Sequence, residues 1–264
     1  YGSCGRIASY CKSADGSYSL RTGGSYNVAN EFYDAHEKKT MAPVDIYIDV
    51  LTKAFPQVAN STYSVNEGRG VIYVTRDDPD GAGGVQPCVR IRNGIKLPTG
   101  GLSIASDLPI YLEGEYNTCT VQPALLTGDA VTFLSKNWQD ARSRAGCADR
   151  VPVHTIYNTV IMTGNTATSP GAYNGGLENV LRFLENWSGK TVTYRGSIID
   201  LWYSEIANSA WVTPGTGTGQ YYGAPTRDWG YDEIYRSKVP PGMTRVFGVE
   251  EIGWQESTWA NEGW

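Results

Sequence analysis

The chain has 264 residues and a mass of 28.8 kDa, which allows one large domain or two small ones with a substantial buried core. Its 22 basic and 27 acidic residues give a net charge of -5, which argues against a general nucleic-acid binder, since such proteins gather a basic surplus on one face. The 31 glycines, 18 tyrosines and 8 tryptophans are typical of a β-rich protein with many turns.

The first 42 residues are polar, and we predict an irregular N-terminal segment with a short helical piece over 29–39. The next stretch, PVDIYIDVL (43–51), alternates apolar and polar residues, which is the period of a strand. Its apolar positions also fit a helical stripe. We therefore predict a strand that enters a short helix.

Short apolar runs recur from residue 70 onward and are separated by turn residues such as Asn93-Gly94. If one apolar run is taken for each repeat, the centres of these runs fall near residues 73, 90, 111 and 132. A step of about 20 residues is the length of one coil of a β-solenoid, in which each coil covers the apolar face of the last. The runs predicted to be strands are 71–74, 89–91, 95–97, 102–104, 110–112, 130–134, 155–162, 192–194 and 198–202.

One later segment has a helical pattern instead. Its apolar residues Leu177, Val180, Leu181, Leu184 and Trp187 recur at the spacing of one helix face, which predicts an amphipathic helix over 175–188. The tail from residue 228 is rich in Trp, Pro and Gly, and we interpret it as an aromatic cap. The expected fold is thus mainly β: a right-handed parallel β-helix with an inserted amphipathic helix and an aromatic C-terminal cap. Its domains are an irregular or helical segment over 1–42 and a β-helix domain over 43–264.

Five cysteines lie too far apart for a CxxC pattern, and the two histidines add little, so a zinc site is not indicated. Cys4 and Cys11 bracket one short loop, and Cys119 and Cys147 bracket a second segment. We predict at least one disulfide among these four, with Cys88 left over, and disulfides favour an exported protein. The alternative is five buried thiols in a cytosolic protein.

No apolar run approaches the 18 residues that a transmembrane helix needs, so we expect no membrane span. The first residues, Tyr1-Gly2-Ser3-Cys4, do not resemble a signal peptide. A start without Met suggests a processed chain or an excised piece.

The stretches GGLSIASDLPIYLEGEYNT (100–118) and GGLENVLRFLENWSG (175–189) stand in an order that resembles one protein family. It comprises large bacterial cell-envelope proteins of the type IV pilus-assembly, minor-pilin-like kind, and the resemblance is to their C-terminal β-helix region. It implies an extracellular or cell-surface location, a β-helix and association with pilus-like structures. The hydrophobic prepilin segment is missing, and Cys4 and Cys11 depart from the pattern. The family supplies no catalytic residues to carry over.

An acidic turn is the candidate ion site. Asp77, Asp78 and Asp80 could offer the oxygen ligands that Ca²⁺ prefers, although the turn lacks the spacing of an EF-hand. The alternative is a solvated turn held by its own Asp side chains. Ca²⁺ is the only cofactor that the sequence suggests.

A second candidate site joins carboxylates to aromatic rings: Asp200, Trp202, Glu205, Asp228 and Trp229. Glycosidases use paired carboxylates, and aromatic rings stack on sugars, so this set could form a glycan or partner surface. The alternative is that both tryptophans cover the end of the fold. His154 in a strand-like run and His36 in a charged segment are interpreted as structural or solvated.

The leading functional hypothesis is an extracellular structural or adhesive protein, either pilus-associated or a filament-forming subunit, without enzymatic activity. Its partners would be further copies of itself, pilus or envelope proteins, or glycans, with no nucleic acid. Trp254, Trp259 and Trp264 in the tail are candidate assembly contacts. The alternatives are a carbohydrate-active enzyme and a glycan-binding adhesin.

Overall fold

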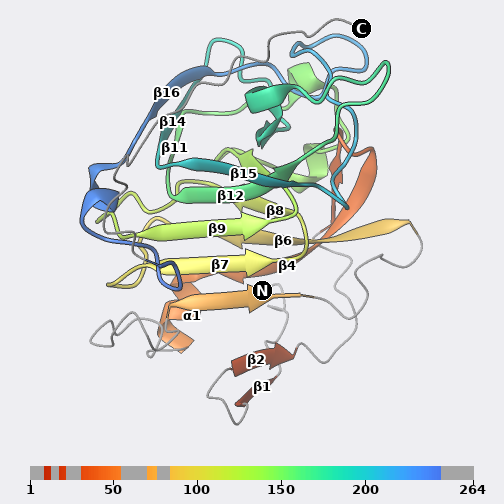
Figure 1. Cartoon of the computed structure of the whole chain (residues 1–264). Coiled ribbons are helices and arrows are strands. Elements are labelled where there is room, and N and C mark those ends of the chain that lie inside the picture. Colours follow the sequence, from red (N-terminus) through yellow and green to blue (C-terminus); the bar gives the residue numbers. More distant parts are fainter. Residues whose placement is uncertain (1–8, 13–17, 22–30, 55–69, 76–83, 245–264) are drawn as a thin grey trace, which may run out of the picture.

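The computed structural model of the chain describes residues 9–12, 18–21, 31–54, 70–75 and 84–244 (Figure 1). Short strands are the main regular structure of the described residues, and most of them pair side by side in three larger sheets. A separate antiparallel pair is formed by β1 (Ser9–Lys12) and β2 (Tyr18–Arg21).

The largest sheet has six strands, and all its neighbours are parallel except β3 and β4. In spatial order it contains β13 (Leu181–Phe183), β10 (Val131–Leu134), β8 (Ile110–Glu113), β6 (Val85–Arg92), β4 (Lys39–Tyr47) and β3 (Phe32–Asp34).

Two further sheets are wholly parallel. The five-stranded sheet contains, in spatial order, β15 (Ile198–Tyr203), β12 (Val160–Asn165), β9 (Ala124–Gly128), β7 (Leu102–Ser106) and β5 (Val71–Val74). The three-stranded sheet contains β11 (Thr155–Asn158), β14 (Thr191–Arg195) and β16 (Thr226–Gly230).

Helical structure is limited to short pieces in the described residues. The one α-helix among the described residues is α1 (Ile48–Ala54), directly after β4. The 3₁₀ turns are η3 (Asp140–Arg142), η4 (Cys147–Asp149), η5 (Gly176–Asn179) and η6 (Glu233–Arg236). No helix among the described residues is long and apolar enough to cross a membrane.

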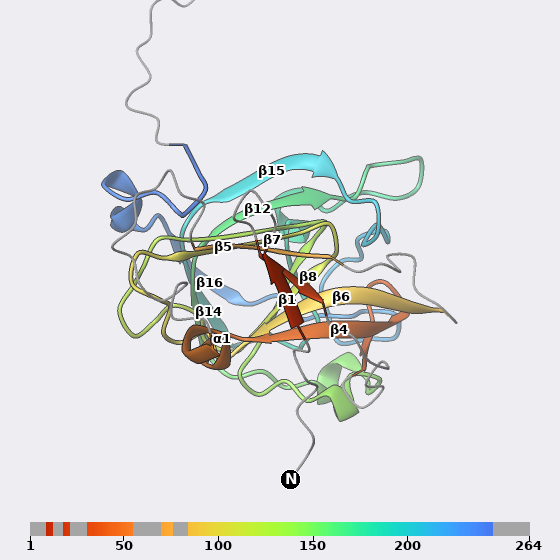
Figure 2. The same cartoon turned by 90° about the horizontal axis from the view of Figure 1, so that it is seen from below.

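The core lies between the sheets, which face one another across it (Figure 2). Aligned residues form apolar rows across strands, such as Ile104, Leu126 and Ile161 in the five-stranded sheet. Aromatic rings join the sheets: Phe133 of β10 stacks on Tyr157 of β11 with ring centroids 4.1 Å apart. Each strand is too short to fold alone, so stability comes from burying these rows against their neighbours.

The predicted right-handed parallel β-helix with an inserted helix and an aromatic cap is wrong. The strands form mixed and parallel sheets of unequal size with one half-barrel. A repeat of constant length is not kept: Val89, Ile110 and Val131 are aligned partners at steps of 21 residues, but Val131 then pairs with Leu181, 50 residues later. The predicted step of about 20 residues also combined strands from different sheets. The run at 71–74 belongs to the five-stranded sheet, whereas the run at 89–91 belongs to the six-stranded sheet.

The predicted amphipathic helix over 175–188 is also wrong. Gly175 has a left-handed φ of 80°, η5 follows it, and the next residues form β13. Nearly every side chain from 180 to 187 is buried, including Arg182 and Glu185, whereas Leu177 is 72% exposed. A surface helix needs a solvated face, and residues 180–187 have none because their charged side chains find partners inside.

The other local predictions have mixed outcomes. The strand entering a short helix is confirmed by β4 and α1. The described part of the predicted helical piece, 31–39, is instead β3, a turn and the start of β4, while residues 29 and 30 lie outside the described part. β4 therefore crosses the predicted domain boundary at residues 42 and 43. The run 95–97 forms no strand, and the run 155–162 is split between β11 and β12. Part of the expected cap forms β16 and η6, while residues 245–264 lie outside the described part.

Candidate functional site

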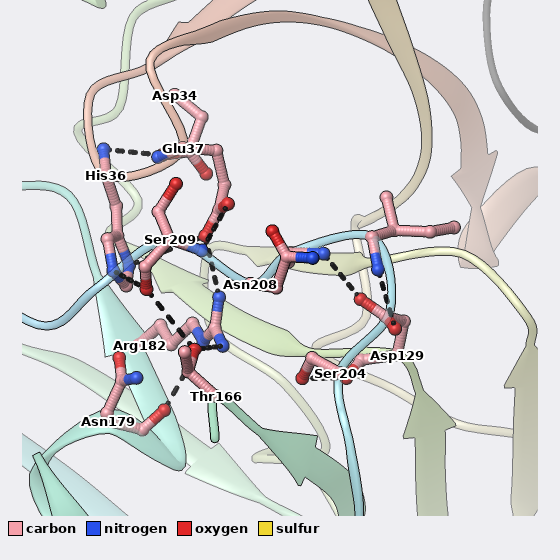
Figure 3. A network of polar contacts seen from close by, with 12 residues as sticks. Asp34, His36, Glu37, Asp129, Thr166, Asn179, Arg182, Ser204, Asn208 and Ser209 are labelled. Atoms are coloured by element: carbon pink, nitrogen blue, oxygen red, sulfur yellow. Dashed lines mark hydrogen bonds and ion pairs between the residues drawn. The ribbon is translucent and has the colours of Figure 1, made fainter. Parts of the chain in front are cut away.

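The most prominent polar cluster joins the β3–β4 turn to distant loops (Figure 3). Asp34 at the end of β3 accepts hydrogen bonds from the backbone N–H groups of His36 (2.7 Å) and Glu37 (2.9 Å). The hydroxyl of Tyr111 donates to the other oxygen of Asp34. The turn is therefore fixed by a buried carboxylate, and it directs His36 and Glu37 inward.

Arg182 of β13 meets this turn from the opposite side. Its Nη1 lies 2.9 Å from Glu37 Oε1, and both side chains are only 3% exposed. The second oxygen of Glu37 accepts the backbone N–H of Ser209 at 3.0 Å. Thr166 contributes a hydroxyl that contacts Arg182 and the Ser209 carbonyl. The cluster thus ties together segments up to 173 residues apart in the chain.

A histidine, a glutamate, an aspartate and an arginine in one place suggest catalysis, but the geometry favours a structural role. Burial, helped by the charge of Arg182, lowers the pKa of His36 to about 3, so the imidazole is neutral at physiological pH. The ring stacks on Tyr221 at 4.1 Å, and Nε2 lies 3.2 Å from the Ser209 carbonyl. Burial also raises the pKa of Glu37, against the opposing charge of Arg182. These groups face one another rather than a space that a substrate could enter.

Asp129 organises the adjoining loop in the same figure (Figure 3). Its carboxylate accepts the backbone N–H groups of Glu205 (2.6 Å), Ile206 (3.2 Å) and Ala207 (2.7 Å). The Ser204 hydroxyl donates to the Asp129 carbonyl at 2.7 Å. A carboxylate that caps three consecutive N–H groups resembles the cap of a helix and fixes the loop after β15.

A second buried charge cluster connects β4, β6 and η3. The guanidinium of Arg90 is fully buried and lies 2.6 Å from both Asp45 Oδ1 and Asp140 Oδ1. Glu113 of β8 adds a contact at 3.5 Å to Arg90 and also pairs with Arg92. Each arginine is therefore matched by carboxylates on neighbouring strands, as buried charges require.

A small hollow lies beside Glu185, between Trp138 and Arg150. Glu185 is 1% exposed, and its two oxygens accept the backbone N–H (2.6 Å) and the hydroxyl (2.7 Å) of Ser135. Burial nevertheless raises the pKa of Glu185 to about 7. The hollow measures about 20 Å³, which is room for about one water molecule. This carboxyl group can exchange a proton near neutral pH, but the space excludes an organic substrate.

The surface offers a different kind of feature at β15, the terminal strand of its sheet. Leu201 is 62% exposed, Trp202 38% and Tyr203 70%. The register with β12 shifts between Thr163 and Gly164, which leaves Leu201 without an aligned partner. Trp202 lies against Gly164, where a Cβ would come within 2.5 Å of the ring, so only glycine admits the indole there.

The predicted glycan surface is divided between two sheets. Asp200 and Trp202 lie on β15, whereas Asp228 and Trp229 lie on β16. Asp228 accepts hydrogen bonds from Arg195 (2.8 Å) and Thr193 (3.0 Å), which hold its pKa below the usual range. Trp229 packs on Tyr194 at 6.0 Å, with Arg227 over its ring. Glu205 follows β15 with an exposed side chain. Glycan binding by these residues stays a prediction.

The structure describes only some of the residues predicted to form disulfides, an ion site or an assembly contact. Cys119 is exposed and Cys147 is buried, and both are free thiols, so the structure does not join them. Cys4 lies outside the described residues, as do Asp77, Asp78 and Asp80, while only the backbone of Cys11 is described. Trp254, Trp259 and Trp264 also lie outside the described part. No group of three metal-ligating side chains occurs among the residues that the structure describes.

Sequence patterns missed the residues that form the buried clusters. His36 was interpreted as solvated, but it is 3% exposed. The one available signal was the run LRFLE at 181–185, where two charges sit among large apolar residues. His154, interpreted as structural, contacts Thr193 at 3.0 Å on an exposed part of β14.

Comparison with protein-family models, with characterised proteins and with solved structures finds no match for this chain. The resemblance to pilus-assembly proteins therefore stays a prediction.

Proposed function

We propose that the chain is a non-enzymatic structural or adhesive surface protein that self-associates head to tail. In this proposal the β15 end of the five-stranded sheet in one copy meets the β5 end of the same sheet in the next. The observation that carries it is the exposure of apolar side chains at both ends of this one sheet.

The two ends have matching character. On β15, Leu201 and Tyr203 are more than 60% exposed, and on β5, Tyr73 is 62% exposed and Val71 is 40% exposed. Exposed apolar side chains that cluster on a strand, rather than being scattered singly, are typical of contact surfaces. The acidic or basic residues that usually protect an edge strand are represented here only by Asp200.

The shifted register at Leu201 determines the kind of contact. A bulge interrupts the ladder and twists an edge strand, which opposes uninterrupted strand addition. The contact we propose therefore uses side chains, with Leu201 and Tyr203 packing against Tyr73 and Val71. Because the two surfaces are different, the interface is heterologous and extends into an open chain of subunits when its rotation does not close.

The buried charges support a scaffold role over an enzymatic one. Arg90 and Arg182 connect strands and loops with carboxylates that are themselves buried, and this arrangement favours one rigid conformation. Placement at the bacterial cell surface, and association with pili, extend the proposal on the resemblance alone.

Complementary variants test the proposed association. Sedimentation velocity over a concentration series should show wild-type oligomers that grow with concentration. Leu201→Lys and Tyr73→Lys should each be monomeric, because each places a charge in the apolar contact. An equimolar mixture should form dimers and nothing larger, since each variant keeps one intact end. Ile95→Lys is the matched control, as its side chain is 50% exposed and belongs to neither strand.

Several results would contradict the proposal. A wild-type protein that stays monomeric at millimolar concentration would remove self-association. Oligomers that persist in both lysine variants would place the contact elsewhere. A mixture that stays monomeric would exclude the head-to-tail arrangement. Thermal unfolding of each variant, expected to match wild type, confirms that the fold is kept.

A further inference from the structure

A groove of about 330 Å³ lies between the β3–β4 hairpin and the turn that contains η3. Its walls include Glu31, Tyr33 and Thr40 from the hairpin, and Asp140 and Arg144 from the turn. Its volume falls in the range of small-molecule sites. It is separate from the β15 and β5 surfaces, because β3 and β4 belong to the six-stranded sheet.

Arg144 is held in a defined position at this groove. Its guanidinium carbon lies 4.4 Å from the centre of the Tyr33 ring, and its Nη2 donates a 2.7 Å hydrogen bond to the Thr40 hydroxyl. Tyr33 is fixed in turn, since its backbone N–H donates to the Ser143 hydroxyl at 2.8 Å. A guanidinium has five N–H donors, so most of those on Arg144 stay available.

Arg144 differs from most other arginines in its lack of a countercharge. Within the described part, it makes no ion pair with a carboxylate. Six arginines there do: Arg90, Arg92, Arg182, Arg195, Arg227 and Arg236. A positioned cation without a countercharge, at the edge of a groove, is suited to an anionic group of a ligand. A carboxylate suits such an arginine, because it accepts two parallel hydrogen bonds from the guanidinium.

The other groove walls restrict what the anion can be attached to. Glu31 and Asp140 each bring a carboxylate, and the Asp140 side chain is 25% exposed although Oδ1 contacts Arg90. These oxygens accept hydrogen bonds from hydroxyl groups but repel a small ligand that carries only a negative charge. The combination selects a molecule with one carboxylate and several hydroxyls.

We propose that this groove binds a uronic acid unit, with the sugar carboxylate on Arg144 and sugar hydroxyls on Glu31 and Asp140. This inference is independent of the self-association proposed above. It adds an acidic polysaccharide as a ligand at a second surface.

The test is a calorimetric titration of the full chain with three probes. Glucuronate carries the charge and the hydroxyls, glucose carries the hydroxyls alone, and acetate carries the charge alone. Glucuronate should bind at least about tenfold more tightly than either other probe, because only it satisfies both kinds of group. Measurement at low protein concentration keeps self-association out of the result.

A pair of variants locates the site. Arg144→Gln should weaken glucuronate binding about tenfold or more, since it removes the charged hydrogen bonds. Arg142→Gln is the matched control: it removes an exposed arginine two residues away that does not line this groove, and binding should be unchanged. Both variants should unfold at the wild-type temperature.

Three outcomes would overturn the proposal. Glucuronate binding no tighter than that of glucose or acetate would remove the combined recognition. The absence of any heat of binding from wild type with glucuronate at tens of millimolar would remove the site. Equal loss in Arg144→Gln and Arg142→Gln would show a general charge effect rather than a site.

Discussion

Two terminal strands, β13 and β15, differ in their exposure although each is the last strand of its sheet in chain order. All three residues of β13 are buried, whereas Leu201 to Tyr203 of β15 are exposed. Trp187 and Tyr222 pack their rings on Phe183, and Glu37 neutralises Arg182. An edge strand is thus either covered by later segments or left open for contact.

The comparison shows how a charged residue can help to cover a terminal strand of a sheet. Arg182 stands in the middle of β13 and would be expected to face solvent. Its partner Glu37 comes from a turn 145 residues earlier, so the first hairpin is joined to the end of the sheet. β15 has no comparable partner for Leu201 or Tyr203 among the described residues.

The largest expected effect follows from removing that partnership. Arg182→Met should lower the free energy of unfolding by about 3–5 kcal/mol, because Glu37 is left as a buried charge without its countercharge. Denaturation in urea gives this value. Arg227→Met breaks the more exposed pair with Glu178 and should cost no more than about 1 kcal/mol. Equal losses of stability in the two variants would contradict a special contribution of the buried Arg182–Glu37 pair to covering β13.

A smaller effect is expected from pH at the segment that follows β13. Because burial raises the pKa of Glu185 from 4.5 to about 7, the folded protein holds a proton that the unfolded chain has released between these values. The free energy of unfolding should therefore fall as pH rises through this window, by about 3 kcal/mol from this residue. Arg150 and the Ser135 hydrogen bonds oppose the rise in pKa, and Glu113 adds to it.

The comparison of wild type with Glu185→Gln isolates this contribution. Urea denaturation at pH 5 and pH 8 should show a larger loss of stability in wild type than in the variant. Glu115→Gln removes a carboxylate that pairs with Lys136 at the surface, and it should keep the wild-type dependence. A Glu185→Gln protein with unchanged pH dependence would contradict the assignment.

Part of this fold could be predicted from sequence, and the reasons are local. Alternation identified β4, and short apolar runs identified β5, β7 and β8, because a strand buried on one or both faces leaves that pattern in its own residues. The continuation of β4 into α1 was likewise visible in one stretch.

The remaining features depend on distant partners. The residues of β13 have helical spacing, and a strand with a buried arginine is favourable there because Glu37 and Thr166 bind Arg182 while Trp187 and Tyr222 pack on Phe183. The groove at Arg144 combines a hairpin with a turn about 100 residues later. The sequence of a strand also does not show to which sheet the strand belongs. For this reason the regular spacing of the first apolar runs led to the wrong fold class.

Hydrogen exchange at two protein concentrations tests the proposed association through β15 most directly. At high concentration the backbone amides of β15 and β5 should exchange more slowly, since a neighbouring copy covers them, while those of β13 should not change. The Leu201→Lys protein should lose the concentration dependence. Exchange in β15 that is the same at both concentrations, in a sample that sedimentation shows to be associated, would contradict the account.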